Sequence, residues 1–76
     1  MKILSRRTIL DRLARDRRTI HHIDVTYASG KIARYTDLNK INWWGIQEVN
    51  VRFNELAYLH EGMPTNSIRI KGKKRK

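Results

Sequence analysis

The sequence contains no cysteine, which excludes a disulfide framework, a thiolate zinc site and a cysteine nucleophile. This composition suits a reducing compartment, and we expect a cytoplasmic protein. Uninterrupted apolar runs span only a few positions, so we expect neither a signal peptide nor a membrane-spanning helix. The single proline and the four glycines stand at positions typical of turns, connectors and helix ends.

Motifs that would carry catalysis are also missing. The sequence has no glycine-rich phosphate loop, no Gly-x-Ser-x-Gly nucleophile elbow and no paired general acid and base. A histidine-bearing hairpin (His21, His22), followed by a predicted helix with Asn54 and His60, resembles the ββα-metal nuclease arrangement of the HNH type. The resemblance lacks that motif's flanking proline and glycine pattern, and adjacent strand residues such as the two hairpin histidines point to opposite faces. We therefore expect no enzyme activity, no metal site and no cofactor.

The chain has 76 residues, enough for one domain that buries about 60% of the surface its unfolded form exposes. Internal repeats and linkers between modules are not evident in the sequence. We assign residues 1–71 to a single basic α+β domain. Residues 72–76 have high charge and no apolar side chain, and we expect them to form a disordered basic tail.

The spacing of apolar residues near the start of the chain predicts a helix over residues 6–18. Ser5 has the character of an N-cap, and Leu4 and Ile9 have the spacing of a hydrophobic staple. One stripe of this helix is apolar and faces the core, whereas the opposite arc is rich in arginine.

From residue 20 the period changes to two, which predicts a β-hairpin with strands at 20–27 and 32–36 and a turn at 28–31. A second helix is predicted from about residue 43 to residue 60, ended by Gly62 and Pro64. A short strand at 68–71 is expected to pair with the hairpin. The predicted order is α-β-β-α-β, a two- or three-stranded antiparallel sheet packed by two helices.

Positive charge is concentrated at the two ends of the sequence. Of the net charge of +10, residues 1–18 contribute +5, residues 19–68 contribute −1, and residues 69–76 contribute +6. A near-neutral body between two cationic ends is typical of a protein that docks on an acidic partner.

Our leading interpretation is a small nucleic-acid-binding protein that grips the phosphate backbone of DNA or RNA with an arginine helix and a lysine-rich tail. A solvated helix face, with pairs such as Arg7 and Asp11, is the alternative for the arginines. The residues assigned to phosphate contacts are Arg6, Arg7, Arg12, Arg15, Arg17, Arg18, Arg69, Lys71, Lys73, Lys74, Arg75 and Lys76.

The second predicted helix leaves a possible aromatic stripe at Trp44, Val51 and Tyr58, each seven residues from the next. These side chains could stack on bases, contact a protein, or fill a thin core. The alternative function is therefore a protein-binding modulator, an adaptor or inhibitor of the kind that phages and mobile elements encode, docked on an acidic surface of a nucleic-acid enzyme such as a polymerase or of a ribosome-associated factor. The first helix has no Trp or Phe on its apolar face, and we expect no membrane binding.

Overall fold

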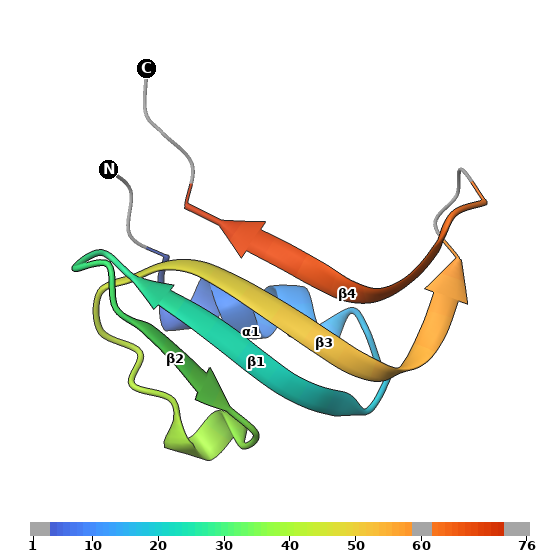
Figure 1. Cartoon of the computed structure of the whole chain (residues 1–76), viewed down its shortest axis with the longest axis horizontal. Helices are drawn as coiled ribbons and strands as arrows, with labels where there is room; N and C mark the ends of the chain where they lie inside the picture. The colour runs from blue at the N-terminus through green and yellow to red at the C-terminus, as the bar shows by residue number, and fades with distance from the viewer. Residues whose placement is uncertain (1–3, 59–61, 73–76) are drawn as a thin grey trace.

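The computed structural model describes residues 4–58 and 62–72. The helix α1 (Arg6–Ala14) precedes β1 (Ile20–Tyr27) and β2 (Ile32–Tyr35), and a short 3-10 turn, η1 (Leu38–Lys40), leads to the long strand β3 (Ile46–Tyr58) and to β4 (Pro64–Lys71). The strands form one antiparallel sheet in the order β2-β1-β3-β4 (Figure 1). The α+β class is confirmed, as a helix on an antiparallel sheet.

The first helix starts as predicted and ends early. Ser5 caps it, because its side-chain oxygen accepts a hydrogen bond of 3.1 Å from the backbone N–H of Thr8. The helix stops at Ala14 instead of continuing to Arg18. The Asp16 carboxylate accepts hydrogen bonds from both the backbone N–H and the guanidinium of Arg18, and this local turn competes with continued helix.

The predicted hairpin is confirmed. β1 and β2 pair in a register that places Asp24 opposite Arg34 and Val25 opposite Ala33. The turn between the strands is closed by a 2.8 Å hydrogen bond from Tyr27 N to Lys31 O. Gly30 has a φ of 94°, a conformation that glycine adopts without strain.

The predicted second helix is wrong, because residues 46–58 form β3. Buried Val49, Val51 and Phe53 alternate with polar residues at positions 50, 52 and 54, which is the period of a half-buried strand. The helix prediction rested on the three-residue spacing of Ile46 and Val49 and the four-residue spacing of Val49 and Phe53. Both spacings also occur in this strand, because the alternation of buried and exposed residues is interrupted after Ile46. The order of elements along the chain is therefore α-β-β-β-β instead of α-β-β-α-β. In the sheet, β3 lies between β1 and β4, so the last strand pairs with β3 and not with the β1–β2 hairpin.

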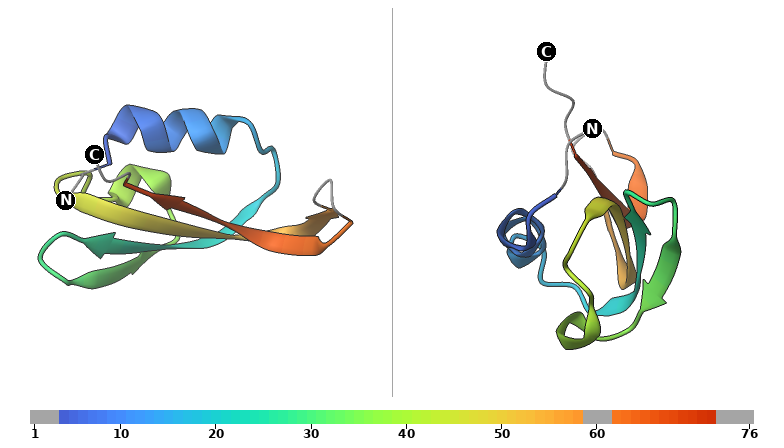
Figure 2. Two further views of the ribbon diagram at one scale, coloured as in Figure 1. Left: turned by 90° about the horizontal axis from the view of Figure 1, so that it is seen from above. Right: turned by 90° about the vertical axis from the view of Figure 1, so that its left-hand side faces the viewer.

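The core lies between α1 and one face of the sheet. Ile9 and Leu13 of the helix pack against the inward-facing side chains of β1 and β3, including Ile23, Val25 and Val51. Figure 2 shows α1 lying along this face, with the opposite face of the sheet left open. Within the described residues, no helix has the length and apolar character needed to cross a bilayer.

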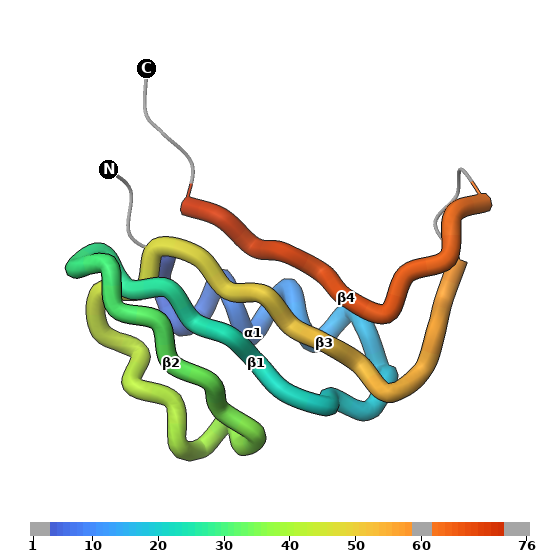
Figure 3. The backbone as a smooth tube through the Cα atoms, viewed as in Figure 1, coloured from blue at the N-terminus to red at the C-terminus, as the bar shows by residue number. Residues whose placement is uncertain are grey.

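Two further features shape the sheet. A register irregularity between Arg52 and Ala57 bends β3, so that the β3–β4 hairpin extends beyond the end of α1 (Figure 3). At the other end of the sheet, Leu4 N donates to Ile46 O at 2.7 Å and Gly72 N donates to Gln47 O at 3.0 Å. Both ends of the described chain are thereby fixed beside the start of β3.

Candidate nucleic-acid interface

The outer face of α1 presents arginines to solvent. Because Ile9 and Leu13 hold the helix against the sheet, Arg7, Arg12 and Arg15 are exposed on its other sides. Arg6, in the first turn, is also exposed. Asp11 lies 3.9 Å from Arg7, but both side chains are largely exposed, at 70% and 92%. A surface pair of this kind contributes little stability and leaves the face cationic. Arg17 is also exposed, just beyond the helix.

Arg18 has a different environment from the other arginines. Its side chain is only 13% exposed, and its guanidinium donates to both carboxylate oxygens of Asp16, at 2.6 to 3.0 Å. It also donates to the backbone carbonyls of Glu55 (3.2 Å) and Thr65 (2.7 Å) and lies 4.2 Å from the centre of the Phe53 ring. These contacts engage most of the guanidinium donors within the fold, which distinguishes Arg18 from the exposed arginines that were also assigned to phosphate contacts.

Arg69 and Lys71, also predicted to contact phosphate, lie on the open face of the sheet. Their neighbours Ile68 and Ile70 face the core, and the alternation of the strand turns the two basic side chains the other way. Both approach Glu48, at 3.6 and 4.0 Å. The sheet therefore separates them from the arginines of α1. The remaining predicted tail contacts, Lys73, Lys74, Arg75 and Lys76, lie outside the described residues.

The open face of the sheet is polar across all four strands. The register aligns Arg34, Asp24, Asn50 and Arg69 in one row, and places His22, Arg52 and Ser67 in the next. Residues from both rows line a shallow hollow of about 190 Å³. Within residues 4–58 and 62–72, the basic side chains on this face are Arg34, Arg52, Arg69 and Lys71, and the acidic ones are Asp24 and Glu48.

The carboxyl group of Asp24 and the imidazole of His22, which both line this hollow, have lowered pKa values. The Arg34 guanidinium donates to the Asp24 carboxylate at 2.8 Å and lowers the pKa of Asp24, against a smaller opposing effect of burial. Burial lowers the pKa of His22, and the nearby charge of Arg34 lowers it further. His22 lies 3.7 Å from Asp24 in the neighbouring row, and the ion pair of Asp24 with Arg34 joins β1 to β2 on the open face.

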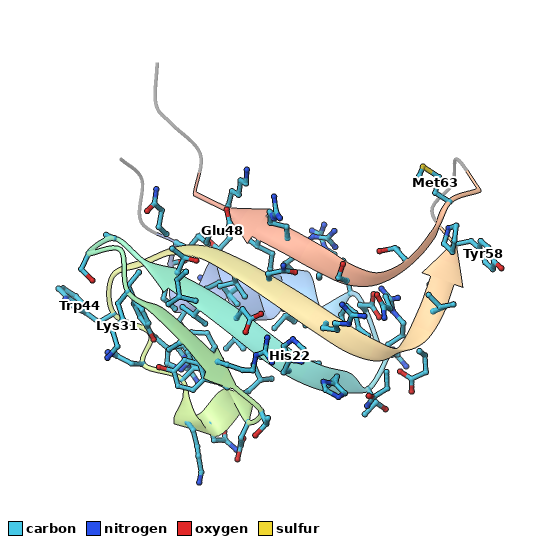
Figure 4. The ribbon with its side chains drawn as sticks, viewed as in Figure 1. His22, Lys31, Trp44, Glu48, Tyr58 and Met63 are labelled. Atoms are coloured by element: carbon cyan, nitrogen blue, oxygen red, sulfur yellow. The ribbon has the colours of Figure 1, made fainter. Side chains whose placement is uncertain are left out.

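The three residues of the predicted aromatic stripe do not lie together. Val51 is fully buried in β3, whereas Trp44 and Tyr58 are 86% and 75% exposed. The stripe required a helix through all three positions, and the strand places them on different parts of the molecule. Figure 4 shows Trp44 and Tyr58 at opposite ends of the sheet.

Trp44 belongs to an aromatic loop at the end of the sheet where α1 begins. Its neighbour Trp43 is half-buried, and the guanidinium of Arg6 lies 5.6 Å from the centre of the Trp43 ring. Two surface hollows, of about 360 and 620 Å³, both have Trp44 in their lining. Lys31 lines the first of them, and Figure 4 shows it next to Trp44.

The histidines do not form a metal centre within the described residues. His21 and His22 lie side by side, with their Nδ1 atoms 2.7 Å apart, and no group of three potential ligands surrounds them in that part of the chain. Asn54 is in a strand and not in a helix, so the resemblance to the ββα-metal arrangement is not borne out. His60 lies outside the described residues.

No known protein family, curated protein or solved structure matches the chain.

The sequence did not identify two basic residues on the open face of the sheet, one on β2 and one on β3. Arg34 and Arg52 were counted in a near-neutral body, but the register brings them onto the same face as Arg69 and Lys71. The signal that could have found them is the alternation in residues 49–54, where valine and phenylalanine take every second position. Lys31 was also passed over, since only the folded loop places it beside Trp44.

Proposed function

We propose that this protein binds nucleic acid through the phosphate backbone, with the exposed arginines of α1 as the principal contact. The observation that supports this most is the exposure of four arginines on α1 and its C-cap, Arg6, Arg7, Arg12 and Arg15, where Asp11 is the only acidic residue between positions 6 and 15. Guanidinium groups match pairs of phosphate oxygens in geometry as well as in charge. A rigid helix holds these groups at a fixed spacing, which lowers the entropy cost of binding a regular polyanion.

Salt dependence of binding tests this proposal. Each phosphate that the protein neutralises releases counterions, so log K falls linearly with log salt. We expect Arg12→Gln and Arg15→Gln each to weaken binding and to reduce the salt slope by about 1, for all sequences alike. Lys40→Gln is the matched control, because it removes an exposed cation that belongs to η1 and not to α1. Gel-shift titrations with DNA and RNA at two salt concentrations are the measurement, and absence of binding at low salt would refute the proposal.

A protein partner is the second candidate, favoured by one observation where β3 ends and β4 begins. Leu56, Tyr58 and Met63 are 63%, 75% and 61% exposed, and Figure 4 shows Tyr58 and Met63 at the same end of the sheet. Exposed apolar side chains gathered in one region are typical of interaction sites. A pull-down with and without nuclease separates the candidates: a protein that survives nuclease and is lost with Tyr58→Ala favours this second one.

A further inference from the structure

The indole ring of Trp44 is exposed on a loop whose backbone is fixed. The backbone N–H of Trp44 donates to the side-chain oxygen of Asn42 at 3.2 Å, and the carbonyl of Gly45 accepts a 2.8 Å bond from the backbone N–H of Ala28. The hydroxyl of Tyr27 holds the carbonyl of Asn42 at 2.8 Å. Gly45 has a φ of 72°, which a glycine adopts freely. A ring presented from such a loop loses little backbone freedom on binding.

The space around this ring is open and suited to a planar ligand. The smaller hollow is lined by polar as well as aromatic residues, including Lys31, Tyr35 and Asn42. The larger is mainly apolar, with Leu4, Ala28 and Trp43 in its lining. Their volumes, about 360 and 620 Å³, fall in the range of small-ligand sites.

Cationic side chains lie beside the two hollows. Lys31 lines one hollow, and Arg6 lies over Trp43, which lines the other. The end of β4 returns to the same place, because Gly72 N bonds to Gln47 O, three residues after Trp44 in the chain. Among the described residues, those that line the two hollows include no Asp or Glu. This end of the sheet thus combines an exposed aromatic ring with a positive rim.

We infer that the Trp44 ring stacks on an unpaired base of a single-stranded nucleic acid, with the phosphates on either side of that base against Arg6 and Lys31. This inference rests on the proposed function and adds the class of substrate to it. The bases of a duplex stack on one another and leave no face for a side chain, whereas an unpaired base offers its face to an aromatic ring. The arginines of α1 begin at this end of the sheet, so they continue the backbone contact from the stacked base.

The test compares wild type, Trp44→Ala and Trp44→Phe on short fluorescein-labelled oligothymidylate, on oligouridylate, and on a DNA duplex of equal length. We expect Trp44→Ala to lower affinity for the single strands by about tenfold, with less than a twofold change for the duplex. Trp44→Phe retains most of the affinity. Tyr58→Ala is the matched control, since it removes an equally exposed ring at the far end of the sheet. In a Trp43→Phe background, oligothymidylate is expected to quench the emission of Trp44.

Each outcome bears on a different claim. Unchanged single-strand affinity in Trp44→Ala, together with weaker binding in Arg12→Gln, overturns the stacking inference and leaves the proposed function standing. Equal losses on single strand and duplex also overturn it. No binding of wild type to any of the three probes at low salt refutes both. Emission that responds to protein concentration but not to oligonucleotide would assign the ring to contact with a second copy of the chain, and would overturn the inference.

Discussion

The guanidinium of Arg18 lies 4.2 Å from the centre of the Phe53 ring and covers the end of the core that α1 does not reach. The same side chain joins the turn after the helix to β3 and β4 through the carbonyls of Glu55 and Thr65. One arginine therefore links three segments that are distant in the sequence. The stability of the bent half of the β3–β4 hairpin depends on it.

Replacing Arg18 is expected to destabilise the fold. Arg18→Ala leaves the Asp16 carboxylate without its partner and uncovers Phe53, at an expected cost of about 2–3 kcal/mol in the free energy of unfolding. Arg18→Lys recovers little, because an ammonium cannot reproduce the forked contacts. Urea denaturation followed by circular dichroism measures this cost. Arg17→Ala, one residue away and exposed, is the control and is expected to change stability by less than about 0.5 kcal/mol; equal effects of the two would contradict the assignment.

The ion pair of Asp16 predicts a pH dependence. The hydrogen bond from Arg18 lowers the pKa of Asp16 below its usual 3.8, despite an opposing effect of burial. The resulting stability is complete above about pH 4 and is lost as the pH falls further, because the unfolded chain then takes up a proton that the folded protein does not. The difference in unfolding free energy between wild type and Asp16→Asn should therefore shrink below pH 4. A difference that stays constant down to pH 2 would refute this account.

The buried hydroxyl of Tyr27 predicts that the stability of the fold depends on pH in the alkaline range. Burial, together with the hydrogen bond to Tyr35, raises the pKa of Tyr27 to about 12. Its contribution to stability is complete below pH 10 and is lost as the pH rises through 12, because the unfolded chain releases this proton first. Ultraviolet titration should show a late phase from Tyr27. That phase should be absent in Tyr27→Phe and present in Tyr58→Phe, whose ring is exposed.

A substitution at Val51 tests whether residues 46–58 form the strand β3 or the helix that the sequence predicted. Because its side chain is fully buried in β3, Val51→Ala is expected to cost about 2 kcal/mol. Leu56→Ala, at a side chain that is 63% exposed, should have little effect on stability. Thermal unfolding of the two variants is the measurement. A folded, fully stable Val51→Ala protein would contradict the packing described for β3.

Local signals predicted the first helix and the hairpin, and non-local pairing decided the rest. Ser5 and the spacing of Ile9 and Leu13 specify α1 within one short segment, and the alternation of residues 20–27 specifies β1. Residues 46–58 satisfy a helical spacing and an alternating one at once, and the exposed edge of β1 selects the strand. The pairing of the strands buries Val51 and places Arg34, Arg52 and Arg69 on the same face of the sheet. Counting charges along the sequence could not predict this shared face.

The attachment of Leu4 and Gly72 to neighbouring residues of β3 has a practical consequence for every binding experiment. A purification tag or fusion partner joined through either end of the described chain enters at the end of the sheet that carries Trp44. A polyhistidine or acidic peptide there would add its own charge beside Arg6 and Lys31 and would compete with, or mimic, a ligand.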